Sequence, residues 1–192
     1  MRYTKIPEAT FQNLQLNAGV MLKDFTPTSG AFEDTDIIGA TSGGVNFVAE
    51  PTFTDFGEDI DNCPANMKEL KRLDTWNVTL SGSLVSVSPS SAELLVGLAD
   101  LATDKITPRN DIDEADFADI WWVGDYSDKN GDTNGGFVAC HLINALSTGG
   151  LNIQSNDNGK GTFSFTFTGH YSLDAQDTPP FEVYVHAGTA EA

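Results

Sequence analysis

Three histidines are the residues of this chain best suited to binding a metal or moving a proton. His141, His170 and His186 each fall in an alternating strand pattern, and none has a second His or a Cys at the spacing of a metal site. The pattern makes His170 and His186 polar-face residues and His141 a buried, hydrogen-bonded one. We therefore expect no metal site and no catalytic histidine.

The segment Asp125–Asp132 offers alternating oxygen atoms around a glycine, as a calcium-binding loop does. Its glycine precedes the last aspartate, whereas an EF-hand loop places the glycine after it, and no bidentate Glu follows at the required distance. Asn130-Gly131 between two apolar runs is typical of a β-hairpin turn. A hairpin from Trp121-Trp122 to Phe137 is therefore favoured over a calcium site.

Two further segments could carry chemistry. The acids between Asp111 and Asp119 could pair for acid/base work, but no His stands near them in the sequence, and their spacing is that of a solvated loop. Gly159-Lys160-Gly161 lacks the remainder of a phosphate-binding loop. We expect no catalytic residue and no cofactor, and hence a protein that is not an enzyme.

Charge and composition narrow the classes of partner. The chain has 28 acids and 10 bases, a net charge of −18, which repels nucleic acids and anionic membranes. A hydrophobic content of 40% and twelve Phe allow a packed core. Residues 1–10 contain no apolar signal core, and no run approaches the ~18 apolar residues of a membrane span. Cys63 and Cys140 form no disulfide framework, so synthesis in a reducing cytoplasm is expected.

Alternation of apolar and polar residues predicts the strands. Residues 162–173 alternate Phe, Tyr and Leu with Ser, Thr and His, and residues 181–186 alternate in the same way. The turn Asp177–Pro180 between them predicts a hairpin that closes the chain. Residues 75–80 also alternate, but the apolar phase then changes to Val85 and Val87, which predicts a bulge near Gly82.

Three more elements complete the pattern. Val45, Phe47, Ala49 and Phe53 share one parity, and Pro51 indicates an edge strand. Residues 135–146 are apolar on both faces, so both should be covered. One helix is expected from Pro89 to Leu101, with an apolar stripe of Leu94, Leu95, Leu98 and Leu101. It begins either with Ser88 as cap and Pro89 at the first helical position, or with a capping box of Ser90 and Glu93.

These elements predict a mainly β fold: a β-sandwich or open barrel of two packed sheets with one flanking α-helix, about residues 89–101. The chain, 1–192, is expected to form a single domain with an N-terminal arm of about residues 1–37. Long polar loops, about 55–69 and 104–119, are uncommon inside a domain unless they bind something. We expect them to contact other subunits.

Six segments follow one another in a characteristic order: Ile38–Phe47 (IGATSGGVNF), the acidic Asp55–Asp61, Leu73–Gly82, the helix Ser90–Leu101, the hairpin Trp121–Phe137, and Gly159–Phe163. Their order resembles that of the major tail proteins, or tail-tube proteins, of long-tailed bacteriophages (siphophages). The resemblance spans residues 38–185 and rests on element order and short glycine-rich phrases.

The resemblance implies the tail-tube fold, which the type VI secretion tube shares, and a structural protein of the virion. Subunits of that family form hexameric rings that stack around a tape-measure protein, and tail-terminator and tail-tip proteins are their other partners. An inner β-sheet lines the lumen, through which DNA passes without specific binding. The implied location is the phage tail, after assembly in the host cytoplasm.

Acidic residues are the candidates for self-assembly or for the lumen. They are Glu50, Asp55, Glu58, Asp59, Asp61, Asp125, Asp128 and Asp132. A negative lumen would let DNA slide, whereas the same charge could serve only solubility, and the sequence leaves both open.

Two other functions stay open as well. One is a different virion protein, of the head-decoration or tail-terminator type. The other is a carbohydrate-binding β-sandwich that uses Trp76, Trp121 and Trp122.

Overall fold

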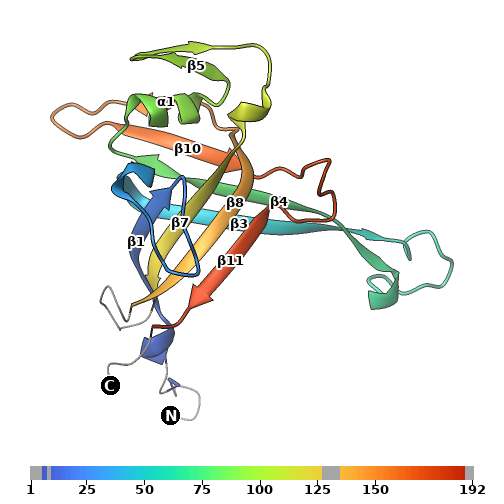
Figure 1. Cartoon of the computed structure of the whole chain (residues 1–192). Coiled ribbons are helices and arrows are strands. Elements are labelled where there is room, and N and C mark those ends of the chain that lie inside the picture. Colours follow the sequence, from blue (N-terminus) through green and yellow to red (C-terminus); the bar gives the residue numbers. More distant parts are fainter. Residues whose placement is uncertain (1–5, 8–9, 127–134, 189–192) are drawn as a thin grey trace.

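The computed structural model describes residues 6–7, 10–126 and 135–188 (Figure 1). The mainly β prediction is confirmed. The strands are β1 (Gln15–Leu22), β2 (Ile37–Gly39), β3 (Thr41–Asp55), β4 (Lys71–Leu84), β5 (Ala99–Ala102), β6 (Lys105–Pro108), β7 (Ala118–Tyr126), β8 (Gly136–Ser147), β9 (Asn152–Gln154), β10 (Thr162–Thr168) and β11 (Phe181–His186). The helices are α1 (Pro89–Val96) and four short 3₁₀ segments, η1 (Thr10–Asn13), η2 (Asp34–Asp36), η3 (Lys68–Leu70) and η4 (Glu114–Asp116).

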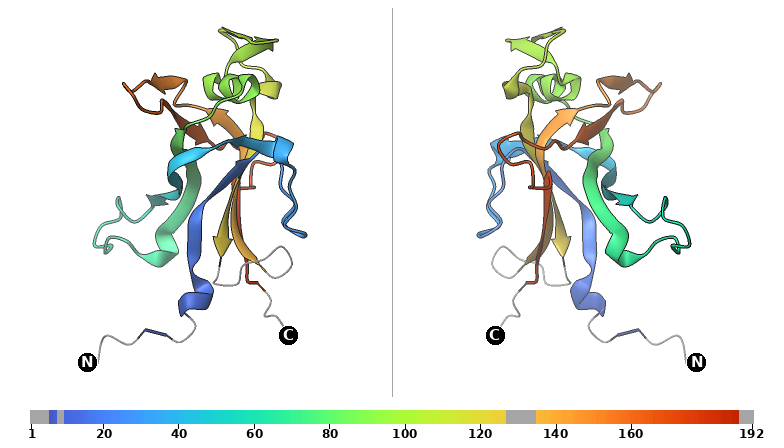
Figure 2. Two further views of the ribbon diagram at one scale, coloured as in Figure 1. Left: turned by 90° about the vertical axis from the view of Figure 1, so that its left-hand side faces the viewer. Right: turned by 90° about the vertical axis from the view of Figure 1, so that its right-hand side faces the viewer.

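One large antiparallel sheet folds into two layers through β8. Its order is β2-β1-β7-β8-β10-β4-β3, with β11 on β8 and β9 on β10. The first part of β8 pairs with β7 and β11, and its last residues pair with β10. We call β2, β1, β7, β8 and β11 the β1 layer, and β9, β10, β4 and β3 the β4 layer. The layers lie against each other with their strands crossing, as an open sandwich (Figures 1 and 2).

The main core fills the space between the layers. Strand β10 turns Phe165 and Phe167 inward, where both are buried, and its Ser and Thr residues face outward. Burying a side chain of this size contributes about 1.5–3 kcal/mol. The other fully packed members of this cluster are Met21, Ile38, Val78, Leu80, Leu84, Leu95, Ile120, Leu142 and Ala145.

Strand β8 is covered on both faces, as predicted. Leu142 and Ala145 both enter the main core, because Asn144 takes a left-handed conformation (φ 48°) and shifts the alternation by one residue. On the opposite face, a second cluster joins Ala139 to Trp121, Leu22 and Phe25. Phe25 belongs to the segment that follows β1, so this segment covers the outer face of the β1 layer.

The helix is shorter than predicted. Ser88 caps it by accepting a hydrogen bond from the Ser91 amide (3.2 Å), with Pro89 in the first turn, so the first of the two predicted starts is confirmed. It ends at Val96, because Gly97 adopts φ 85° as the C-cap. Residues 99–101, predicted as the last helical turn, instead belong to strand β5, which pairs with β6.

The irregularity near Gly82 lies in the partner strand. Strand β4 keeps one inward phase through Val78, Leu80 and Leu84, and Val85 and Val87 follow its end. The register shifts in β3 between Thr41 and Val45, where Gly43 and Gly44 have positive φ. Gly82 is required for another reason: a Cβ there would lie 2.8 Å from the Phe165 ring. The sequence prediction placed the bulge in the wrong strand.

The predicted closing hairpin is also wrong. Strand β11 pairs with β8 along its whole length, and β10 pairs with β4, β8 and β9. Strand β10, in the β4 layer, ends at Thr168, and residues 169–180 connect it to β11 in the β1 layer. The strand alternation was correct, but the pairing depends on a long-range contact that no local pattern encodes.

Residues 15–22, assigned to an N-terminal arm, form β1 within the sheet, because Met21 and Leu22 are fully buried there. Strand β3 is at the sheet edge, as Pro51 predicted. Within the described part of the chain, no helix has the length and apolarity that a membrane crossing needs.

Candidate assembly surface

A long hairpin projects from the body of the molecule. Strands β3 and β4 continue to pair beyond the other strands of their layer, as far as Asp55 opposite Lys71 (Figure 1). The loop of residues 56–70 joins them. We call residues 53–73 the hairpin tip. It extends away from the core, so its side chains are not needed to hold the core together.

The hairpin tip exposes large apolar side chains. Phe53 and Phe56 are each 51% exposed and Ile60 is 52% exposed, while Met67 and Leu73 also lie in solvent. Exposed apolar groups that gather on one projection mark interaction sites more often than scattered ones do. Phe, Met and Arg are also the side chains enriched in protein interfaces, whereas Lys and Glu are depleted.

Three of the ten basic residues also lie in the tip. The Lys71 Nζ atom lies 5.2 Å from the centre of the Phe53 ring, and the Arg72 guanidinium lies 5.0 Å from the centre of the Phe56 ring. Lys68 is in the adjoining turn, with its side chain 88% exposed. Each exposed cation–π contact contributes about 0.5–1 kcal/mol, so these pairs hold the aromatic rings in place.

Asp55 organises the loop from within. Its carboxylate accepts the backbone N–H of Gly57 and of Asn66, both at 2.9 Å, and these bonds lower the pKa of Asp55 below its ordinary value. Gly57 is buried, and a Cβ there would lie 3.1 Å from the Cys63 Sγ atom. The loop is therefore a defined structure that presents Phe56 and Ile60 outward.

The opposite end of the molecule is acidic. The segment of residues 24–37, here called the acidic end, contains Asp24, Glu33, Asp34 and Asp36, with η2 closed by a reciprocal capping box. Its Phe32 side chain is exposed and lines a hollow of about 500 Å³ together with Asp24 and Glu33. The acidic end and the hairpin tip lie on opposite sides of the molecule in all views (Figures 1 and 2).

The predicted acidic candidates divide into three places. Asp55, Glu58, Asp59 and Asp61 are together in the hairpin tip, and Glu50 lies on the outward face of β3 opposite Asn77. Asp125 is far from them, near the end of β7, where it accepts a hydrogen bond from Asn17. Asp128, Asp132 and the predicted Asn130-Gly131 turn lie outside the described residues. The predicted hairpin is confirmed by the antiparallel pairing of β7 with β8.

The apolar residues of the tip are the part that the acidic candidates did not include. Phe56 and Ile60 lie among acids in a predicted loop. That combination was the available signal, because large apolar side chains gathered on one projecting loop mark interaction sites more often than scattered ones do.

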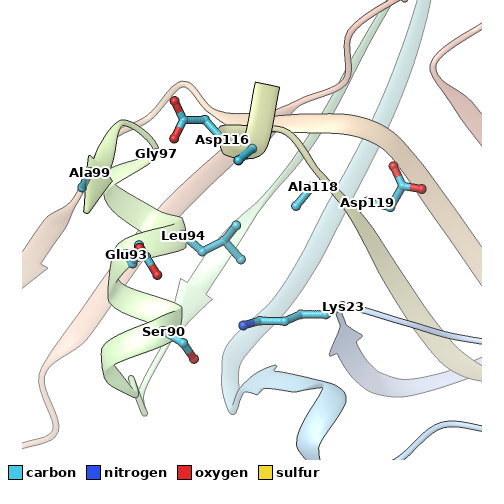
Figure 3. A pocket seen from close by; sticks show the side chains of 10 residues that line it. Lys23, Ser90, Glu93, Leu94, Gly97, Ala99, Asp116, Ala118 and Asp119 are labelled. Carbon is cyan, nitrogen blue, oxygen red and sulfur yellow. The ribbon is translucent and has the colours of Figure 1, made fainter. Parts of the chain in front are cut away.

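The acids of residues 111–119 hold the chain together. Arg109 forms ion pairs with Asp100 (2.9 Å), Asp113 and Asp116, which pins the loop to β5. A cavity of about 250 Å³ lies between this loop and α1, and Lys23 extends across it toward α1 (Figure 3). Among its acids, Glu93 accepts the Leu101 amide and Asp116 binds Arg109. These carboxylates serve structure and do not form a free pair.

A histidine does lie beside one of these acids, although none is near in sequence. His141 Nε2 is 3.1 Å from Asp119, and its Nδ1 is 3.5 Å from Glu182, which accepts a hydrogen bond from Tyr184. That bond raises the pKa of Tyr184. The His141 ring stacks on Trp121 at 3.8 Å and is almost fully buried. The cluster ties β7, β8 and β11 together across the sheet, with the His141 ring buried and the Asp119 and Glu182 side chains about half exposed.

The other two histidines have structural partners. The Nδ1 atom of His170 is 3.1 Å from the carbonyl oxygen of Asn144, and His186 stacks on Phe137 at 5.3 Å. Among the described residues, no group of three or more His, Cys, Asp or Glu is arranged to hold a metal ion.

Comparison with known proteins gives weak structural matches only. No family model matches the chain, and no curated protein matches it. One solved structure, "Virion of native gene transfer agent (GTA) particle", has a chain that aligns with a TM-score of 0.42 and 8% identity over 81% of this chain and 92% of that one. A second, "Tail of empty GTA particle computed with helical refinement, C6 symmetry", aligns at 0.39 and 11% with the same coverage. Likenesses of this size carry no conclusion about function.

The three tryptophans are all engaged inside the protein. Trp76 packs on Phe181 at 5.2 Å, and the Trp122 indole donates a hydrogen bond to the Ala18 carbonyl. Trp121 is buried beneath His141. A sugar-binding platform needs an exposed aromatic face, which buried Trp121 does not offer, while Trp76 and Trp122 are half-buried.

Proposed function

We propose that this chain is a structural subunit that assembles head to tail into the tail tube of a phage-like particle. The observation that carries the proposal is the polarity of the molecule. An apolar hairpin tip that also carries Lys68, Lys71 and Arg72 among five acids projects from one side of a chain of net charge −18, and an acidic end with exposed Phe32 lies on the other. The exposed Lys68 and Arg72 side chains of the tip can meet carboxylates of the acidic end, and each surface also exposes Phe side chains.

This arrangement favours an open assembly. Contacts between two different surfaces of identical copies are heterologous, and they generate rings when the rotation closes and filaments when it does not. The resemblance noted in the sequence supports hexameric rings stacked around a tape-measure protein, bounded by terminator and tip proteins. In this proposal the protein works in the virion, has no catalytic role, and lets DNA pass without specific binding.

Negative-stain microscopy of the purified full-length protein tests the proposal. Rings with a central channel, or tubes built from them, are the expected result at high protein concentration and physiological salt. Isolated single rings that never stack would favour a terminator-type protein. Monomers at all concentrations, together with binding to a glycan array, would replace the proposal with the carbohydrate-binding alternative.

A further inference from the structure

Residues of η4, of β8 and of the connection after β10 together line a hollow in the surface. Its volume is about 430 Å³, and its lining consists of Glu114, Phe117, Asn144, His170, Tyr171 and Ser172. We call it the Phe117 hollow. Three of its six residues carry rings, and the rings of Phe117 and His170 meet edge to face at 5.3 Å. Hollows of ~300–1,000 Å³ with aromatic walls and a few polar groups are typical of small-ligand sites.

The nitrogen donors around the hollow are engaged within the protein. The Nδ1 atom of His170 lies 3.1 Å from the Asn144 carbonyl oxygen, which can only accept, so Nδ1 donates. The Asn144 side-chain amide donates in turn to the His170 carbonyl oxygen at 3.2 Å. In the neutral imidazole ring, Nε2 then remains as a hydrogen-bond acceptor.

Glu114 gives the hollow its charge. Its neighbours Asp113 and Asp116 pair with Arg109, but no ion pair or hydrogen bond joins the Glu114 carboxylate to another described residue. All the lining residues are described, and none of them is Lys or Arg. The hollow is therefore complementary to a cation, and an anion would be repelled. Aromatic rings add to the attraction, because a cation is drawn to the negative face of a ring.

We propose that the Phe117 hollow binds a primary ammonium group on an aliphatic stem. An ammonium has three donors and no acceptor, so it matches a lining that offers the Glu114 carboxylate and His170 Nε2 as acceptors. The stem would lie against the Phe117 ring. None of these residues belongs to the hairpin tip or the acidic end, so the site is independent of the proposed assembly contact.

Titration of dispersed full-length subunits with n-butylamine, in an amine-free buffer of low salt, tests the site. The Cε1–H NMR resonance of His170, assigned by its absence in His170→Asn, should shift saturably, and 1-butanol should not shift it. Glu114→Gln should weaken binding at least about five-fold. Asp111→Asn, an exposed acid of the same loop outside the lining, should leave binding unchanged. A shift without saturation, an equal response to 1-butanol, or equal weakening by the two variants would overturn the proposal.

A second probe separates hydrogen bonding from charge. Tetramethylammonium carries the same charge as butylammonium but has no N–H group, so it should bind at least about five-fold more weakly. Equal affinity for the two cations would overturn the assignment of a primary ammonium.

Two sources could supply the ammonium group: a lysine side chain of a second copy, or a free alkylamine. Sedimentation velocity distinguishes them, with sodium chloride of equal ionic strength as the reference. If butylamine and Glu114→Gln each raise the protein concentration at which subunits associate, the occupant is a lysine of a second copy. Unchanged association identifies a free alkylamine. Failure of the first titration overturns the site in both cases, whether or not the protein forms tubes.

Discussion

Asp55 and Asn66 lie eleven positions apart, and the carboxylate of Asp55 accepts the backbone N–H of Asn66 at 2.9 Å, closing the loop of the hairpin tip. Replacing Asp55 with Ala removes this acceptor and the bond to Gly57. We expect faster amide hydrogen exchange at Gly57 and Asn66 and weaker tube formation, with the thermal midpoint nearly unchanged because the tip is peripheral. Asp59→Ala, an exposed change in the same loop, is the control. Equal exchange in the two variants would contradict this role.

The same hydrogen bonds predict a pH dependence. Because they lower the pKa of Asp55 in the folded protein, the ionised carboxylate stabilises the loop fully above its unfolded pKa of about 3.9, and this stabilisation is lost as the pH falls through the lower, folded pKa. Protection of the Asn66 amide, measured as its exchange rate relative to the intrinsic rate, should therefore fall below about pH 4 in the wild type. In Asp55→Ala this protection should not change with pH.

Charge reversal tests the head-to-tail contact. Lys68→Glu removes a cation from the tip and should weaken assembly, and Asp34→Lys at the acidic end should restore it when both changes are in one chain. Each exposed pair contributes about 0.2–1 kcal/mol, which shifts the critical concentration up to about five-fold. Sedimentation velocity measures that shift. Additive losses in the double variant would mean that these two surfaces do not meet.

Core packing separates two leucines that the sequence placed on one helical stripe. Leu95 is fully buried, so Leu95→Ala should lower the free energy of unfolding by about 2–5 kcal/mol. Leu98 lies beyond the end of α1 and is half-buried, so Leu98→Ala should cost under about 2 kcal/mol. Urea denaturation followed by fluorescence gives both free energies of unfolding. Equal costs for the two variants would favour the longer helix that the sequence predicted.

The two cysteines should differ in reactivity. Burial raises the pKa of the Cys140 thiol to about 11, whereas Cys63 is half-buried in the hairpin tip. Because the thiolate is the reactive form, Cys140 should react with iodoacetamide at pH 8 at least ~100-fold more slowly than an exposed thiol. Mass spectrometry resolves the two sites, and in urea the difference should vanish. Rapid alkylation of folded Cys140 would contradict its burial between the layers.

Local patterns predicted local structure and failed where pairing partners were distant. The alternation around Phe165 and Phe167 predicted β10 correctly, because the alternation of side chains between two faces depends only on the strand's own backbone. The partner of β11 is β8, which precedes it by more than thirty residues and which no turn signal indicates. Likewise, Asp119 and Glu182 were not predicted as neighbours of His141, because they reach it across adjacent strands. The hairpin tip was predicted as a contact loop, but its apolar content was overlooked in favour of its acids.

Salt should control assembly through two opposed effects. Copies of net charge −18 repel at long range, and the Debye length falls from about 30 Å at 0.01 M to about 8 Å at physiological ionic strength. In the proposed contact between the tip and the acidic end, the attraction acts only at short range, and the apolar part, through Phe56 and Phe32, does not weaken with salt. We therefore expect dispersed subunits in low salt and tubes as salt rises toward 0.15 M.

Single substitutions separate the two effects of salt. Neutralising Asp59 or Asp61 reduces the long-range repulsion, so either variant should form tubes at lower salt than the wild type does. Lys68→Glu should shift the threshold upward, because it adds repulsion and removes an attractive charge. Light scattering across a salt series gives each threshold, and duplex DNA should stay unbound throughout. Assembly that instead weakens steadily with added salt would mean that ion pairs between copies, and not the apolar side chains of the tip, hold the tube together.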